Sequence, residues 1–294
     1  MPRIVSLIAS ATEIVDALGM LDDLVGRSHE CDYPERVRAL PVCTRPRIDI
    51  DADSREIDRQ VRASAEMRVS IYDVFDDLIE SLDPTHILTQ IQCEVCAVSL
   101  RDIEAALARG MKSRPRIVSL QPNSLAEIWE DVRRVARSLA IEQRGEDLVR
   151  ELQSRMERLS RPVVEAPRLL VACVEWIEPL MTAGHWMPEL VAMAGGVNIS
   201  AGTWEELVAA EPDAIVVAPC GFDLARAEQE MYWLTGKPDF ERFRSRVFVA
   251  DGNQYFNRPG PRVVETFEIL LEILRPGVAG GKHRGPAWRD MMSR

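Results

Sequence analysis

Short apolar runs alternate along the chain with longer segments whose apolar residues recur at helical spacing. This alternation is typical of parallel sheets with crossover helices. The predicted strands lie at residues 4–8, 86–90, 116–120, 168–173, 214–218 and 247–250. Several predicted helices begin with a hydroxyl residue that Glu follows three positions later, as in a capping box. These pairs are Ser10 with Glu13, Ser124 with Glu127, and Thr203 with Glu206. The pattern predicts an α/β fold.

Two internal repeats favour a pair of similar lobes, although short repeats also arise by chance. Pro-Arg-Ile-Val-Ser-Leu occurs at residues 2–7 and again at 115–120, and an acidic residue, Pro and an apolar strand recur at 83–88 and 211–216. Residues 142–160 predict one long helix, roughly 28 Å at 1.5 Å per residue. We therefore expect two doubly wound parallel-sheet lobes joined by this backbone helix. The expected parts are an amino-terminal lobe at 1–122, connecting helices at 123–165, a carboxy-terminal lobe at 166–275, and a frayed tail at 276–294.

Charge and the amino terminus limit the partners. The formal net charge of −11 argues against nucleic acid, because phosphate binding needs clustered Lys and Arg. No apolar stretch approaches the roughly 20 residues of a membrane span, which argues against membrane insertion. The first apolar run is too short for a secretory signal. We therefore expect a cytoplasmic protein that binds a small molecule, and the missing export signal argues against a transporter partner.

Cysteines supply one candidate site. Cys93 and Cys96 form a C-x-x-C pair after a predicted strand, and Cys31 follows a predicted strand at 24–27. Loops after neighbouring strands converge on one rim, so the three thiolates would meet there, with His29 or Glu30 completing a metal site. Three thiolates with an open position fit zinc, an iron–sulfur cluster or a soft-metal cargo. Buried core cysteines, or two separate thiol sites, are the alternative.

Aromatic residues in the second lobe supply another candidate site. Trp176, Trp186 and Tyr255 occupy loops or helix starts, where flat side chains would suit a large planar ligand and stay partly accessible. A core role for each Trp is the alternative. The candidate ligand-binding residues are Ser10, Trp176, His185, Trp186, Cys220, Tyr255 and Asn257.

Several segments resemble a known family. Residues 3–19, 193–198 and 211–217 resemble stretches of the helical-backbone (class III) substrate-binding proteins, which include carriers of vitamin B12, ferric siderophores and haem. The segments His-Glu-Cys-Asp-Tyr-Pro at 29–34, Cys-Glu-Val-Cys at 93–96 and 176–186 resemble a signal-less, cobalamin-binding-like branch. The resemblance implies two sheets joined by a rigid helix, with the ligand held between the lobes by loops after the strands.

Two functions follow as alternatives. The first is a binding protein that holds a corrinoid, such as cobalamin, or another metal chelate. The second is a zinc or iron–sulfur metalloprotein or enzyme that uses Cys31, Cys93 and Cys96 on the same fold. The sequence contains no G-x-S-x-G elbow, phosphate-binding loop or H-E-x-x-H motif. It therefore favours a binding protein over an enzyme.

Overall fold

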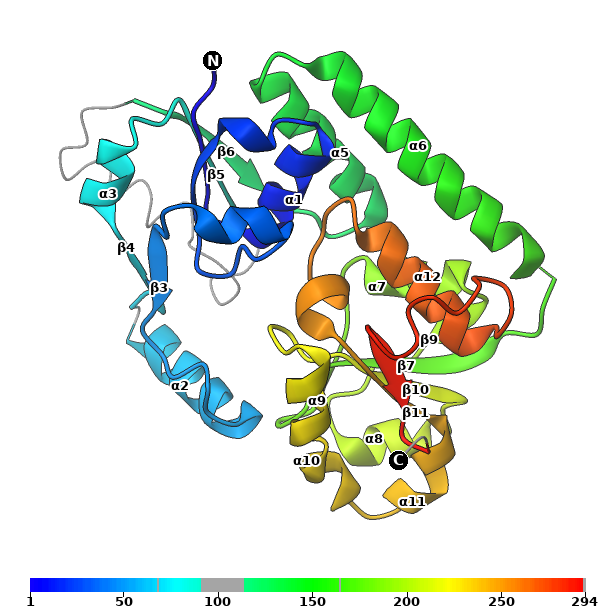
Figure 1. The fold of residues 1–294 in the computed structure, drawn as a ribbon. Helices are drawn as coiled ribbons and strands as arrows, with labels where there is room; N and C mark the ends of the chain where they lie inside the picture. Colours follow the sequence, from blue (N-terminus) through cyan, green and yellow to red (C-terminus); the bar gives the residue numbers. More distant parts are fainter. Residues whose placement is uncertain (68, 91–113, 164, 293–294) are drawn as a thin grey trace. The chain divides into compact units, whose positions relative to one another are not determined.

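The structure is a computed structural model, and it describes residues 1–67, 69–90, 114–163 and 165–292. The chain divides into two compact units (Figure 1). The first unit consists of Met1–Ala52 with Arg59–Glu151, and the second of Asp53–Asp58 with Leu152–Arg294. Each unit is described by itself below.

A parallel sheet forms the centre of the first unit. Its strands are β1 (Ile4–Ser6), β2 (Leu24–Arg27), β5 (His86–Gln90) and β6 (Arg116–Leu120), in the order β2-β1-β5-β6. Strand β1 is buried on both faces, since neighbouring residues Ile4 and Val5 are both 0% exposed, as expected for a central strand. Val5 and Leu7 are buried with Ile79 and Ile87 in one core cluster, which Tyr72 completes.

Other elements belong to this unit. Helix α1 (Ala9–Ala17) packs on α5 (Leu125–Ser138), and β3 (Thr44–Pro46) pairs with β4 (Tyr72–Val74) in a small antiparallel ribbon. Two further helices are α3 (Asp76–Ser81) and α2 (Ser54–Glu66), and the first residues of α2 belong to the second unit.

Helix α6 (Glu142–Ser160) carries the chain from the first unit to the second. It is 19 residues long and has the bounds that the sequence predicts. Apolar residues at helical spacing explain it, since Val149, Leu152 and Met156 are buried. In the described ranges, no helix is long and apolar enough to cross a membrane.

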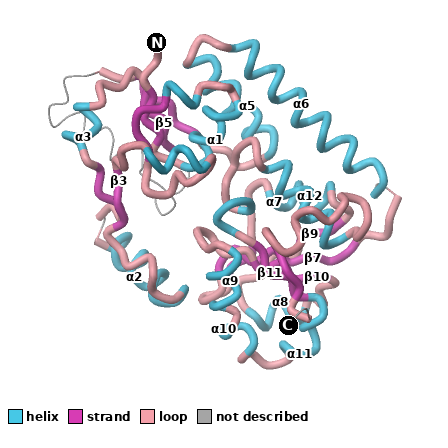
Figure 2. The backbone as a smooth tube through the Cα atoms, viewed as in Figure 1, coloured by secondary structure: helices cyan, strands magenta, loops and turns pink. Residues whose placement is uncertain are grey.

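The second unit contains a mixed sheet. Its strands follow the order β12-β11-β10-β7-β8, and β9 also pairs with β7. The bounds are β7 (Leu169–Trp176), β8 (Met181–Thr182), β9 (Gly196–Asn198), β10 (Ala214–Val217), β11 (Val247–Ala250) and β12 (Trp288–Asp290). The central strands β7, β10 and β11 are parallel, whereas β8 and β12 run antiparallel to their neighbours. Figure 2 shows these strands in magenta as one layer.

Helices cover both faces of this second sheet. In Figure 1, α7 (Met187–Met193) and α12 (Val263–Leu274) lie on one side, and α8 (Trp204–Ala209) and α11 (Phe240–Phe243) lie on the other. Helices α9 (Leu224–Glu230) and α10 (Tyr232–Thr235) connect β10 to α11. The predicted fold class, two α/β lobes joined by a long helix, is therefore confirmed.

The carboxy-terminal segment differs from the frayed tail that the sequence predicts. Strand β12 pairs with β11, and the side chain of Glu272 on α12 accepts hydrogen bonds from the His283 backbone N–H and the Trp288 indole N–H. His283 is buried, and its Nε2 lies 3.0 Å from Oε2 of Glu268. The segment is held by partners that are distant in the sequence, β11 and Glu272. Its own Gly-rich composition did not indicate these contacts.

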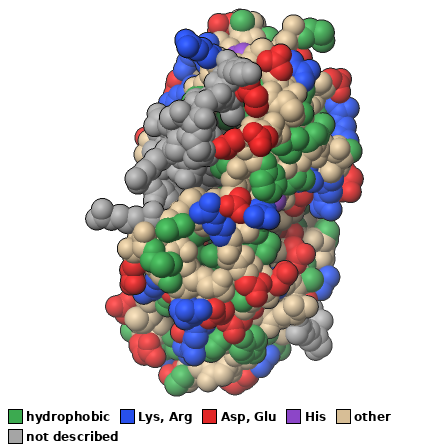
Figure 3. Space-filling model, turned by 90° about the vertical axis from the view of Figure 1, so that its left-hand side faces the viewer, with side chains coloured by type: hydrophobic (Ala, Val, Ile, Leu, Met, Phe, Trp, Pro, Cys, Tyr) green, Lys and Arg blue, Asp and Glu red, His purple; other side chains and the backbone are tan. Residues whose placement is uncertain are grey.

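Charged side chains of both signs share the surface. On the face in Figure 3, Lys and Arg alternate with Asp and Glu instead of gathering by sign. Many exposed charges are paired, as Arg45 and Arg47 are with Asp73. Exposed pairs of this kind stabilise a fold by about 0–1 kcal/mol each. They therefore help to keep the surface solvated and contribute little to the choice of fold.

Candidate ligand-binding site

The strand order of the first unit reverses between β1 and β5. From β1 the chain moves outward to β2, whereas β5 and β6 lie on the other side of β1. In open parallel sheets, ligands bind outside the carboxyl ends of the strands at such a reversal. The residues that follow β1 are therefore the described part of this unit where we expect ligand contacts.

Ser10 lies at this place, in the first turn of α1. Its side chain is only 2% exposed, and its Oγ has no hydrogen-bond partner in the part of the chain that the structure describes. The predicted capping box of Ser10 and Glu13 is wrong, because α1 begins two residues earlier and Ile8 occupies the N-cap. Ser10 is thus a helical residue with a buried hydroxyl, and its ligand-binding role stays a prediction.

Cys31, in the loop after β2, is fully buried. Its Sγ lies 3.0 Å from Oγ1 of Thr12, which donates to it, and 3.1 Å from Oγ of Ser28. Burial raises the pKa of Cys31, against the hydrogen bonds from Ser28 and Thr12, which lower it. The thiol is therefore protonated at neutral pH and belongs to a packed hydroxyl–thiol cluster.

His29 is fixed by a hydrogen bond at its inner nitrogen. Its Nδ1 lies 2.8 Å from Oγ1 of Thr44, and its ring packs on Tyr72. Burial, and secondarily the charge of Arg27, lower the pKa of His29 to about 4. The imidazole is therefore neutral at pH 7.

The predicted metal site of Cys31, Cys93, Cys96 and His29 stays a prediction. Cys93 and Cys96 lie outside the described residues. Within residues 1–67, 69–90, 114–163 and 165–292, no three His, Cys, Asp or Glu side chains come together as a metal site.

Three neighbouring parallel strands of the second unit end in candidate ligand-binding residues. Trp176 ends β7, Cys220 follows β10, and Tyr255 follows β11. Because β7, β10 and β11 are adjacent and parallel, their carboxyl ends deliver these three residues to one edge of the sheet. Each of the three side chains is partly exposed.

The two aromatic rings at this edge each have more than one neighbour: the Trp176 indole N–H donates to the Ser54 carbonyl, 3.2 Å away, and the Tyr255 ring lies edge-on to that of His283. The Trp176 ring lies 5.4 Å from that of Phe222. The Arg262 guanidinium lies 4.6 Å from the Tyr255 ring centroid, and burial raises the pKa of the Tyr255 hydroxyl. Both rings are therefore held in place while keeping some surface accessible, as a contact residue for a flat ligand must.

Asn257 and Gly252 support this edge. The Asn257 side-chain amide donates to the backbone carbonyls of Ala218, 3.1 Å away, and Gly252, 3.0 Å away. A Cβ at Gly252 would come within 2.0 Å of the Pro219 carbonyl oxygen, so only glycine fits there. Asn257 thus connects the loop after β11 to the loop after β10, and its amide nitrogen is already occupied.

Trp186 and His185 come at the start of α7. Trp186 is 8% exposed, so the expectation of an accessible Trp186 is wrong. Its position at the start of α7 places the indole in the core, where His185 stacks on it at 5.9 Å. His185 is exposed, with a positive φ of 53°.

Two buried arginines near Tyr255 escaped the sequence analysis. Arg258 donates to Oδ1 of Asn253 at 3.0 Å, and Arg262 donates to Glu265 at 3.0 Å and to Gln254 at 2.9 Å. Arginine is rarely buried unless it is paired, so the Arg-Pro-Gly-Pro-Arg run at 258–262 could have indicated them.

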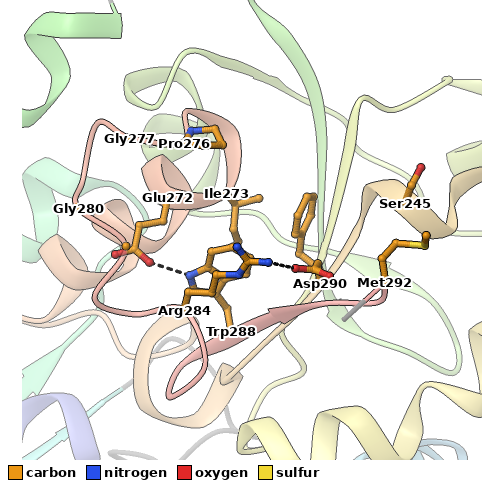
Figure 4. Close-up of a pocket in the computed structure, with 12 residues that line it drawn as sticks. Ser245, Glu272, Ile273, Pro276, Gly277, Gly280, Arg284, Trp288, Asp290 and Met292 are labelled. Carbon is orange, nitrogen blue, oxygen red and sulfur yellow. Dashed lines mark hydrogen bonds and ion pairs between the residues drawn. The ribbon is translucent and has the colours of Figure 1, made fainter. Parts of the chain in front are cut away.

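A pocket of about 500 Å³ opens beside the carboxy-terminal segment of the second unit (Figure 4). Phe248, Ile273 and Trp288 supply apolar walls. Figure 4 shows its polar side chains engaged with one another: Glu272 accepts from the Trp288 indole, and Arg284 pairs with Asp290. This pocket therefore presents apolar surface with polar groups already satisfied.

A smaller pocket of about 320 Å³ lies beside β6 in the first unit and is lined by Ser119, Gln121, Glu127, Glu130, Asp131 and Arg134. Asp131 is buried and accepts hydrogen bonds from the Gln121 backbone N–H and from Arg134. Burial raises the pKa of Asp131 to about 6, although Arg134 and the Gln121 N–H lower it.

Comparison with known proteins identifies relatives over almost the whole chain. Residues 4–232 match the family described as "Periplasmic binding protein". The vitamin B12-binding protein of Vibrio vulnificus is 22% identical over 281 residues, covering 92% of this chain and 89% of that protein. A vitamin B12-binding protein of Vibrio cholerae is 22% identical over 283 residues, covering 93% and 89%.

Solved structures share the fold. The periplasmic vitamin B12 binding protein BtuF of Vibrio cholerae matches with a TM-score of 0.65 and 21% identity, over 93% of this chain and 96% of that chain. A periplasmic heme binding protein from Pseudomonas aeruginosa matches with a TM-score of 0.70 and 19% identity, over 94% of each chain. At these identities the likeness shows the fold alone.

These matches correct the predicted location. The sequence led us to expect a cytoplasmic protein, but the matching family and the structural neighbours are periplasmic binding proteins. The prediction is therefore wrong, because the first residues of the sequence do not outweigh relatedness along the rest of the chain. The chain belongs to the periplasmic binding protein family.

Proposed function

We propose that this protein binds a metal chelate of the corrinoid or haem class and presents it to a membrane transporter. The observation that carries the proposal is the pair of partly exposed aromatic rings, Trp176 and Tyr255, at the same edge of the second sheet. Flat, rigid side chains bind planar macrocycles with little loss of side-chain entropy.

The surroundings of this edge support a preformed site. Asn257 ties two of its loops together, and Arg262 holds Tyr255 from one side. Relatives named for binding vitamin B12, and structural neighbours named for binding heme, have ligands of this size and chemistry. We propose a transporter as the protein partner because one structural neighbour is named as an ABC transporter substrate-binding protein.

The experiment is a spectroscopic titration of the purified protein. Hydroxocobalamin, haem and a ferric siderophore are each added, and binding is followed by the visible bands of the chelate. We expect one of them to bind, and Trp176→Ala or Tyr255→Ala to weaken its binding by about two- to tenfold, since an aromatic contact contributes about 0.5–1.5 kcal/mol. Metal analysis of the protein as purified identifies any chelate already bound.

Phe248→Leu is the matched control. Phe248 is also a partly buried aromatic of the second unit, but it lines the pocket in Figure 4 instead of the edge. We expect this variant to bind normally. Loss of binding in Phe248→Leu with normal binding in Trp176→Ala would move the ligand to the other pocket and contradict the proposal.

A further inference from the structure

The start of helix α1 has backbone donors without acceptors. The first helical hydrogen bond runs from the Thr12 N–H to the Ile8 carbonyl, 3.2 Å apart, and Ile8 offers no side-chain cap. The N–H groups of Ala9, Ser10 and Ala11 precede this bond. Across the described ranges, none of the three has an acceptor.

This helix start is buried. Ala9 is 5% exposed and Ser10 2%, so these donors have little access to bulk solvent. A side chain at the same place has the same property: the buried Oγ of Ser10 makes no hydrogen bond within the described chain. Buried helix ends are normally satisfied by a cap, by water or by a ligand. Three N–H donors and one hydroxyl together require an acceptor with several lone pairs.

The charge at this edge suits a negative acceptor. The amino end of a helix carries a partial positive charge, roughly half an elementary charge. Arg27 ends β2 and is the register partner of Ser6 at the end of β1. Its guanidinium donates only to the carbonyls of Ser28 and Arg38, and no carboxylate among the described residues pairs with it.

Two acidic residues belong to the same region, and both are engaged. Glu30 lies 4.0 Å from His29, and Glu13, one turn further along α1, has an interaction of its own. Neither carboxylate accepts from the α1 donors. Among the residues that the structure describes, no carboxylate thus accepts from the donors at the start of α1.

We propose that the amino end of α1 binds an oxyanion, a carboxylate or phosphate group. Ala9, Ser10 and Ala11 supply backbone N–H donors, and Ser10 adds its hydroxyl. The position fits, because α1 begins at the carboxyl end of β1, where the strand order reverses. The inference concerns the first unit alone and goes beyond the proposed function.

The test uses two variants that remove donors. Ala9→Pro removes one N–H at the first helical position, where proline is tolerated. Ile8 already has the extended backbone that a residue before proline prefers, with φ −148° and ψ 140°. Ser10→Ala removes the hydroxyl. Ser124→Ala is the control, since its hydroxyl caps another helix and accepts from the Glu127 N–H.

Thermal unfolding is measured in chloride, inorganic phosphate and malonate at equal ionic strength. We expect phosphate, malonate or both to stabilise the wild type, and the response shows which oxyanion the site takes. Both variants should bind that anion about tenfold more weakly, as expected for a lost hydrogen bond to a charged group. Ser124→Ala should respond as the wild type does.

Equal responses in the wild type, Ala9→Pro and Ser10→Ala would overturn the proposal, as would no response in the wild type. The chelate titration of the same proteins is the second arm. If a chelate binds but no oxyanion protects the wild type, the oxyanion site fails while the proposed function stands. If no chelate binds but phosphate protects through Ser10, the proposed function fails and the oxyanion site stands.

Discussion

The same six residues, Pro-Arg-Ile-Val-Ser-Leu, lead into two different helix starts in the first unit. The copy at 2–7 contains β1 and is followed by α1, and the copy at 115–120 contains β6 and is followed by α5. The start of α5 is closed by its own side chains. Ser124 accepts from the Glu127 N–H, and Glu127 accepts from the Asn123 N–H.

The loop before α5 is closed in the same way. Asp131 accepts from the Gln121 N–H. Three side chains, those of Ser124, Glu127 and Asp131, therefore accept from backbone N–H groups of this junction. The junction between β1 and α1 contains only Leu7 and Ile8, both apolar, and offers no such acceptor. One strand sequence therefore leads to one self-sufficient helix start and one that needs an external acceptor.

Position in the sheet explains where the difference matters. β6 has one neighbour in its sheet, β5, whereas β1 lies between β2 and β5. An acceptor supplied by a ligand is useful only where ligands bind, at the central reversal of strand order. Because α5 follows the same six residues and is capped by Ser124, the missing cap of α1 is not dictated by the strand sequence. The missing cap therefore indicates a place where a ligand can supply the acceptor.

The largest expected effect concerns Asp131. Burial raises its pKa from the ordinary 3.8 to about 6. Between pH 4 and 6 the folded protein therefore binds a proton that the unfolded chain does not, and the free energy of unfolding falls as the pH rises through this window. The fall amounts to about 3 kcal/mol, at about 1.4 kcal/mol per pKa unit. Asp131→Asn should remove it.

Urea denaturation of the wild type and Asp131→Asn from pH 4 to pH 7 measures this effect. Other carboxylates titrate in both proteins, so the difference between the two curves is the quantity to follow. We expect the free energy of unfolding of Asp131→Asn to rise relative to that of the wild type as the pH increases. Parallel curves would show that the pKa of Asp131 in the folded protein is close to its ordinary value.

The next effect concerns the cap itself. Ser124→Ala should lower the free energy of unfolding by about 1 kcal/mol, because the Glu127 N–H loses its acceptor. Thr203→Ala is a matched case in the second unit, since Thr203 caps α8 and accepts from the Glu206 N–H at 3.2 Å. Denaturant unfolding should give similar losses for both. No loss in Ser124→Ala would mean that water satisfies α5 as well as serine does, which would weaken the contrast with α1.

The sequence predicted the strands and α6 because their apolar periodicity is local. The predicted strands at 86–90, 116–120 and 247–250 have the bounds that the structure gives them. The capping boxes at Ser124 and Thr203 were also correct. The same pattern failed at Ser10, because the short junction after β1 places the helix start at Ala9.

The site was harder to predict because burial depends on distant partners. Trp176 and Trp186 look alike in the sequence, but α7 directs Trp186 into the core while Trp176 stays partly exposed at the end of β7. Strand β12 pairs with β11 across some 40 residues of chain, and nothing in its own composition announces a strand. Local patterns therefore located the edges of the sheets but not which side chains remain open there.

The smallest expected effect is on Ser10, and it separates a structural hydroxyl from a binding one. With no oxyanion present, the Oγ of Ser10 is buried without a partner in the described chain, so its removal breaks no hydrogen bond. Ser10→Ala should leave the free energy of unfolding unchanged or raise it by up to about 1 kcal/mol, because it removes an unsatisfied buried group and alanine favours the helix. The measurement is urea unfolding in a chloride buffer free of phosphate and carboxylates, beside Ser124→Ala. A loss of about 1 kcal/mol, equal to that of a lost cap, would show that Ser10 is satisfied from within the protein. The start of α1 would then be as self-sufficient as the start of α5.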